Sequence, residues 1–353
     1  MCCSAWWRAG DSKRPSIRMS KYLLFLLAVS AFGQGQVGGV QQPAGVISAG
    51  TFVASSVPPQ AAAVGYNTQT FYSSMAAADF DLAEAYTTGK KWYLGNFQGS
   101  TPPPSATVTF GQNYAVVGGN NATSIICTAG ASGAPGTGLW VGTAFGGGAY
   151  FEAEFAFDPA QTAANNGSVG GGYGSWPAFW SDTLEQFLTM TPVVDQWPGQ
   201  ATGYESYVEP DFFEYQSGGA IGSVEQFGSS IHQGYGIWNS TCPPGYCVIT
   251  ASENGTAPTG TRWTEYHRLG ALWVPATVST SGYMSFYLDG VLYNTVTWTK
   301  FVAQAPPPTA QPWAYGVMDL RHLVVMFDTG PNQPFSVRYM GVWQANGSGN
   351  LVH

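Results

Sequence analysis

The chain has 353 residues, a net charge of −8 and only 12 basic residues, a balance that argues against nucleic acid or an anionic membrane as its partner. Glycine (46), proline (23) and aromatic residues (15%) are abundant, and only 9% of the residues are charged. No long amphipathic helical pattern occurs. This composition excludes a helical bundle or a doubly wound fold and predicts an all-β domain.

An apolar run at residues 22–31 follows three basic residues near the start of the chain. The run is too short to span a bilayer, but it has the length and flanks of a signal-peptide core. We therefore expect residues 1–33 to form a leader and signal peptide, with Met19 as a second candidate start of translation. The mature protein is then expected to be secreted and to have no membrane span.

The rest of the chain divides into three stretches. Residues 34–69 are rich in Gly, Ala, Gln, Val and Ser, which is typical of a flexible or irregular segment. Residues 70–346 carry short alternating segments separated by Gly, Asn, Pro and Ser, and examples are Thr107–Phe110, Tyr150–Phe157 and Met284–Leu288. This pattern predicts one large β-sandwich of jelly-roll type. Residues 347–353 are expected to be a tail.

Three cysteines remain once the leader is removed. Cys242 and Cys247 flank a short loop that a disulfide would close in an oxidising compartment. Cys127 is then left over, and we interpret it as a small buried apolar residue rather than a redox centre.

Three carboxylates lie close together in Tyr207–Tyr215, a segment otherwise made of β-formers. Glu209 and Asp211 are two residues apart, so their side chains share one face of a strand. Glu214 would point to the opposite face of a regular strand. One extra residue around Phe212–Phe213, a β-bulge, would return it to the face of the other two, and bulges are common beside active sites.

Two carboxyl groups in one cleft can break a glycosidic bond. A separation of about 5–5.5 Å is typical of retaining enzymes, which form a covalent intermediate. In this hypothesis Glu209 is the nucleophile, Glu214 is the acid/base, and Asp211 orients Glu209 and tunes the pair. Clustered carboxylates cannot all ionise, so a proton donor would be available without any metal. The alternatives are a solvated acidic strand face or a Ca²⁺ site.

Several segments in chain order resemble the family 16 glycoside hydrolases of the laminarinase-like branch. The acidic segment is similar to the family's Glu-Ile-Asp-Ile-x-Glu strand. Ser175–Trp180 is similar to the family's Trp-Pro-Ala-x-Trp strand, and Ser285–Gly290 is similar to its Phe-Tyr-Val-Asp-Gly hairpin. The other matching segments are Ile231–Tyr235, Tyr266–His267 with Leu272–Trp273, Leu323–Phe327 and Val337–Trp343. The likeness covers roughly residues 70–345. Two positions depart from the family pattern: Pro210 replaces an apolar strand residue, and Leu272 stands where many members have Glu.

The resemblance implies a concanavalin A-like jelly roll of two antiparallel sheets with a concave glycan cleft. It also implies a secreted, endo-acting, retaining hydrolase of β-1,3 or mixed-linkage β-glucan, or of a related polysaccharide. Trp176 and Trp180, four residues apart, would share a face and offer flat rings to sugars. The other expected substrate-binding residues are His232, Tyr215 and Trp238.

Other function classes lack support in the sequence. No G-x-S-x-G elbow occurs, and no two of the four histidines have metal-ligand spacing. We expect a monomer that needs no cofactor, although such sandwiches can carry a structural Ca²⁺. The alternative function is a non-catalytic glycan-binding module, and a third interpretation is a structural cell-surface protein with vestigial acids.

Overall fold

In the computed structural model the described residues are 56–95, 107–120, 123–131, 139–165, 177–185, 204–215, 224–237, 247–300 and 314–353. They all belong to one compact unit, residues 54–353. The expected leader lies outside the described residues, as does Cys242. No helix in the described part of the chain is long and apolar enough to cross a membrane.

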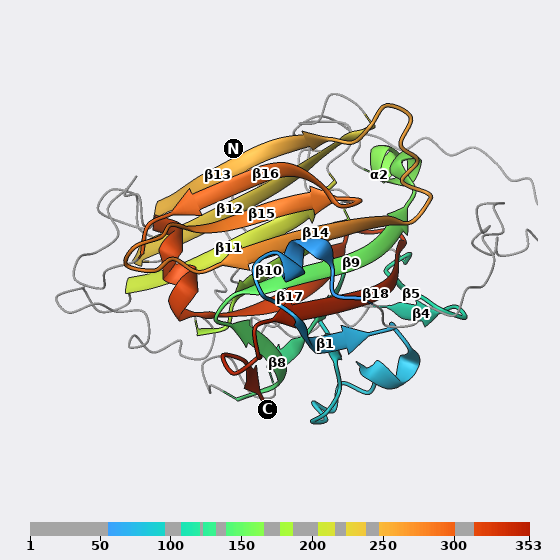
Figure 1. Ribbon diagram of the computed structural model, residues 1–353. Helices are drawn as coiled ribbons and strands as arrows, with labels where there is room; N and C mark the ends of the chain where they lie inside the picture. The colour runs from blue at the N-terminus through green and yellow to red at the C-terminus, as the bar shows by residue number, and fades with distance from the viewer. Residues whose placement is uncertain are drawn as a thin grey trace, which may run out of the picture. The chain divides into compact units, whose positions relative to one another are not determined.

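The described residues form two large sheets (Figure 1). The first sheet runs in the order β16 (Val291–Trp298), β15 (Gly282–Leu288), β14 (His267–Val274), β9 (Ala149–Phe157), β18 (Phe335–Gln344), β5 (Ala115–Val117) and β4 (Val108–Phe110), with β1 (Thr68–Ser73) paired to β18. The second runs β13 (Cys247–Thr256), β12 (Gln226–Ile237), β11 (Tyr204–Glu214), β10 (Ala178–Thr183), β17 (His322–Thr329), β6 (Ser124–Cys127), β3 (Trp92–Leu94) and β2 (Phe80–Asp81). Attached to it through β17 is β8 (Trp140–Gly146), which also pairs with β7 (Ala129–Ala131) and β19 (Leu351–Val352).

Helical structure in the described residues is short: α1 (Pro59–Ala62), α2 (Pro159–Asn165) and the 3-10 helices η1 (Ala77–Asp79) and η2 (Ala314–Leu320). Strand pairs are antiparallel apart from the short parallel pair β2–β3. The predicted all-β sandwich of two antiparallel sheets is therefore confirmed. The three segments whose alternation predicted strands fall in β4, β9 and β15.

The core lies between the two sheets, which are stacked face to face (Figure 1). Alternate residues of β9, β14 and β18 from one sheet meet alternate residues of β10, β11 and β17 from the other. The segment around α1 covers part of the outer face of the first sheet, where Ala61 and Tyr66 pack with Tyr150, Leu272 and Trp343.

The β15–β16 hairpin turns at Asp289 and Gly290, as the family-like segment predicts. Both residues have positive φ, 50° and 81°, which a two-residue type I′ turn requires. The Asp289 carboxylate accepts hydrogen bonds from the backbone N–H of Arg268 (2.8 Å) and lies 2.8 Å from His267 Nδ1. His267 therefore anchors the hairpin to β14.

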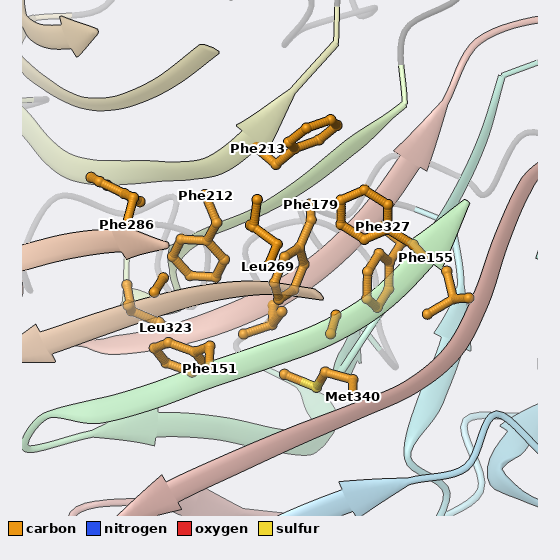
Figure 2. Packing of buried hydrophobic residues seen from close by; sticks show 14 of the residues in the cluster. Phe151, Phe155, Phe179, Phe212, Phe213, Leu269, Phe286, Leu323, Phe327 and Met340 are labelled. Atoms are coloured by element: carbon orange, nitrogen blue, oxygen red, sulfur yellow. The ribbon is translucent and has the colours of Figure 1, made fainter. Parts of the chain in front are cut away.

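Strand β11 sends two consecutive phenylalanines into the core. Phe212 stacks on Phe151 with ring centroids 5.2 Å apart, and Phe213 packs on Phe155 at 4.8 Å. Figure 2 shows both rings among the buried side chains between the sheets. A regular strand would turn one of the two away from the core, so the strand must be irregular here.

Replacing Phe213 with alanine should lower the free energy of unfolding by about 3–5 kcal/mol, because it leaves a cavity in the packed aromatic core. Chemical denaturation would measure the change. Val278→Ala, at a position 88% exposed, is the control and should stay within about 0.5 kcal/mol of the parent protein. Equal effects in the two variants would contradict the packing.

Candidate active site

Three acids lie on one face of the second sheet, which we call the acid-bearing face. Across the β11–β12 pair, Glu209 lies opposite His232, Asp211 opposite Ser230 and Glu214 opposite Gly228. These three partners are two residues apart on β12 and so share one face. The register shifts between Asp211 and Glu214. The predicted bulge is therefore present, and it aligns Glu214 with the other two acids.

The acids differ in exposure. Glu209 and Asp211 are 9% and 4% exposed, whereas Glu214 is half-buried. Val208 and Phe212, which alternate with them, belong to the core between the sheets. The strand thus presents its carboxylates on the side opposite the core.

A chain of hydrogen bonds holds Asp211 in place. Ser230 Oγ donates to Asp211 Oδ2 at 2.6 Å, and His232 Nε2 lies 3.1 Å from the same oxygen. Ser230 Oγ and His232 Nε2 are 3.0 Å apart, and His232 Nδ1 lies 2.7 Å from Thr250 Oγ1. Because Ser230 and His232 both contact Asp211 Oδ2, the orientation of the Asp211 carboxylate between Glu209 and Glu214 is fixed.

The same network changes the acidity of the histidine. Burial alone lowers the pKa of His232, but the hydrogen bond to Asp211 and the charges of Asp211 and Glu214 outweigh burial. The pKa of His232 is therefore raised above its ordinary value. A protonated His232 donates through both ring nitrogens, which suits its contacts with Asp211 and Thr250.

Pro210 interrupts one of the two ladders of β11. The paired register of β10 and β11 ends at Trp180 and Asp211, directly before the proline in the ladder. Beyond that point side-chain hydroxyl groups replace the ladder hydrogen bonds. Ser181 Oγ donates to the Pro210 carbonyl oxygen at 3.3 Å, and Thr183 Oγ1 accepts a hydrogen bond from the backbone N–H of Val208 at 3.2 Å. The missing N–H of Pro210 is accommodated without turning the acids away from their common face.

The other predicted site residues fall into three groups. Trp180 lies on the acid-bearing face, since its neighbour Phe179 enters the core. Tyr215, expected to bind substrate, is instead fully buried in the core beside Phe157 and Trp263, because the residue after Glu214 must point to the opposite face. Trp176 and Trp238 lie outside the described residues.

Two contact residues were not anticipated from the sequence. Ser230 is two residues from His232 and so shares its face, a signal that the sequence contains. Thr250 comes from β13, and only the β12–β13 register places it opposite His232. Nothing local in the sequence indicates that pairing.

The described residues contain no group of three or more His, Cys, Asp or Glu side chains arranged to hold a metal ion. Cys127 is fully buried, and its Sγ lies 2.9 Å from the Gly95 carbonyl oxygen. This agrees with the interpretation of Cys127 as a small buried residue.

No protein-family model and no curated protein matches the chain. Among solved structures the chain is similar to the endo-1,3-β-glucanase from Streptomyces sioyaensis, with a TM-score of 0.43 and 16% identity over 81% of this chain and 97% of that one. A glycoside hydrolase family 16 endo-glucanase from Bacteroides ovatus gives 0.42 and 13%, covering 77% and 99%. Peanut lectin gives 0.31 and 9%, covering 77% and 95%. At these values the likeness does not extend to activity.

Replacing Asp211 with asparagine should lower the pKa of His232, because it removes the charge that opposes the effect of burial. Titration of the histidine ring protons by NMR would measure this. Burial lowers the pKa of His267, but its own partner Asp289 more than offsets this, so the pKa is raised; His267 should titrate as before and is the internal control. An unchanged His232 titration would contradict the network.

Proposed function

We propose that the protein is a retaining glycoside hydrolase that cleaves a neutral β-glucan internally. The observation that carries the proposal is the one-residue bulge that aligns Glu214 with Glu209 and Asp211. The burial of Phe212 and Phe213 requires this bulge, and the bulge also carries Glu214 to the face of the other two acids. The apolar run at residues 22–31 supports secretion as part of the same proposal.

The β11–β12 register is compatible with the distance between carboxyl groups that a retaining mechanism requires. The residues opposite Glu209 and Glu214 are four positions apart on β12, or about 13 Å at the rise of a strand. Two glutamate side chains that lean toward each other over Asp211 shorten this distance considerably. Carboxyl groups about 5–5.5 Å apart would then flank a single glycosidic bond.

The reaction assigns each acid one role. Glu209 attacks the anomeric carbon while Glu214 protonates the leaving oxygen, which breaks the glycosidic bond and forms a glycosyl ester on Glu209. Glu214, now ionised, removes a proton from water, and the water oxygen displaces Glu209 and regenerates both groups. Asp211, held by Ser230 and His232, orients the nucleophile.

A second function is a glycan-binding module without catalysis. The β10–β11 ladder ends beside Glu209, and this favours the binding module, because a catalytic nucleophile needs a well-ordered strand. The hydroxyls of Ser181 and Thr183 restore order at that point, and hydrolysis is therefore the function that we prefer.

Glu209→Gln should reduce hydrolysis of laminarin and mixed-linkage β-glucan by at least about 1000-fold, while folding and glycan binding stay close to those of the parent protein. Release of reducing sugar measures the rate. Glu265→Gln, the same change at an exposed position, is the matched control and should be fully active. A Glu209 variant as fast as the parent would refute the role of Glu209, and binding without turnover in the parent would favour the binding module.

The stereochemistry of the first product is a separate test. Proton NMR during early hydrolysis should show the β-anomer first, because double displacement keeps the configuration. Initial formation of the α-anomer would indicate direct attack by water, for which carboxyl groups stand roughly 6.5–9.5 Å apart. That result would contradict the role given to Glu209.

A further inference from the structure

Two polar groups on the acid-bearing face have no hydrogen-bond partner among the described residues. They are the indole Nε1 of Trp180 and the Oδ1 of Asp328, both out of contact with solvent. Trp180 is only 6% exposed, whereas Asp328 as a residue is half-buried. Native proteins pair nearly all such atoms, so two unpaired groups on the face that carries the proposed catalytic acids call for an explanation.

The strand register places Asp328 in the same cross-strand row as Glu214, two strands away, and Trp180 in the neighbouring row. Asp328 of β17 pairs with Ala178 of β10, and Ala178 pairs with Glu214 of β11. Only the small side chain of Ala178 therefore lies between the two carboxyl groups in this row. Trp180 occupies the next row of β10 and is a diagonal neighbour of Asp328 across the β10–β17 pair.

Both side chains point away from the core. Phe179 and Phe327, the sequence neighbours of Trp180 and Asp328, stack on each other in the core with centroids 4.8 Å apart. Alternation along a strand then directs Trp180 and Asp328 to the acid-bearing face. Trp180 is 6% exposed, close to the 9% of Glu209 and the 4% of Asp211, so its side chain is buried in this face to a similar degree.

The two groups together define the chemistry of a ligand. The indole N–H can only donate, so it needs an acceptor, which a bound cation cannot provide. No ion pair with Asp328 occurs in the described part of the chain, and desolvation raises the pKa of Asp328 to about 7, against the opposing effect of the Thr329 N–H. A carboxyl group in this state accepts or donates a hydrogen bond. A hydroxyl group satisfies both partners, since it donates and accepts at once.

We propose that Trp180 and Asp328 bind a hydroxyl group of the sugar unit adjacent to Glu214 and thereby select the glycan. The proposal rests on the function proposed above and adds a specificity-determining residue, Asp328, to it. A site built to pair a hydroxyl rejects ligands that lack it, because its own polar groups are then left buried and unpaired.

The test measures binding of laminaripentaose and of a mixed-linkage glucan tetrasaccharide by calorimetry in the Glu209→Gln background, and hydrolysis of the same probes in the otherwise unchanged protein. Asp328→Ala and Trp180→Phe should each weaken binding about tenfold. The double variant should be little weaker than either single variant, because one hydroxyl holds both contacts. Asp328→Asn, which keeps hydrogen-bonding capacity, should restore most of the affinity.

The matched control is Gln233→Leu. Gln233 lies opposite the core residue Val208 on the same sheet, and both of its side-chain polar atoms are buried and unpartnered among the described residues. Its replacement should leave affinity unchanged, and circular dichroism would establish that every variant is folded.

The outcomes separate the two proposals. If the parent protein turns over the probes and the affinity is unchanged in Asp328→Ala and Trp180→Phe, the hydroxyl site is overturned but the proposed hydrolase function is not. Binding without turnover, weakened in both variants, would support the hydroxyl site and overturn the hydrolase. Neither binding nor turnover of either probe would overturn both.

Discussion

The bulge at Phe212–Phe213 is the constraint on which the site depends. Both rings are buried against β9, and each fills space that the opposite sheet leaves for an aromatic side chain. A strand can bury two consecutive side chains on one face only by inserting a residue, and the insertion reverses the alternation that follows. Glu214 is consequently carried to the face of Glu209 and Asp211. Core packing and site geometry are thus set by the same two residues.

The site also depends on how β11 tolerates Pro210. Proline removes a ladder donor and is rare in a strand that has neighbours on both sides. Here the β11–β12 ladder continues through Pro210, which pairs with Ile231, while the β10 side gives up its ladder and uses hydroxyl groups. The proline thus affects the side of β11 away from Ser230 and His232. The contacts that orient Asp211 come from the intact side.

Much of the fold and part of the site could be predicted from sequence, because both depend on alternation. Period-two patterns identified β9 and β15, the likeness of Ser285–Gly290 to a family hairpin identified the turn, and the spacing of the acids required the bulge. The same rule places Tyr215 in the core, since it follows Glu214, yet a tyrosine beside the acids suggested a ligand contact. Thr250 and Asp328 could not be found in this way, because their positions depend on pairing between strands distant in the chain.

The two faces of the second sheet differ in how their side chains are paired. On the core side, aromatic rings satisfy one another and need no partner outside the protein. On the acid-bearing face, Trp180 and Asp328 keep polar atoms unpaired in the described structure, which opposes folding. Because the folded-state pKa of Asp328 lies near 7, above the ordinary value of 3.8, the folded protein binds more protons than the unfolded chain between those values. This carboxyl group therefore favours the folded state less as the pH rises from about 4 to 7, and its contribution levels off above that range. Unlike the unpaired amide of Gln233 on the core side, these two polar groups share a face with the proposed catalytic acids, where a bound glycan would pair with them.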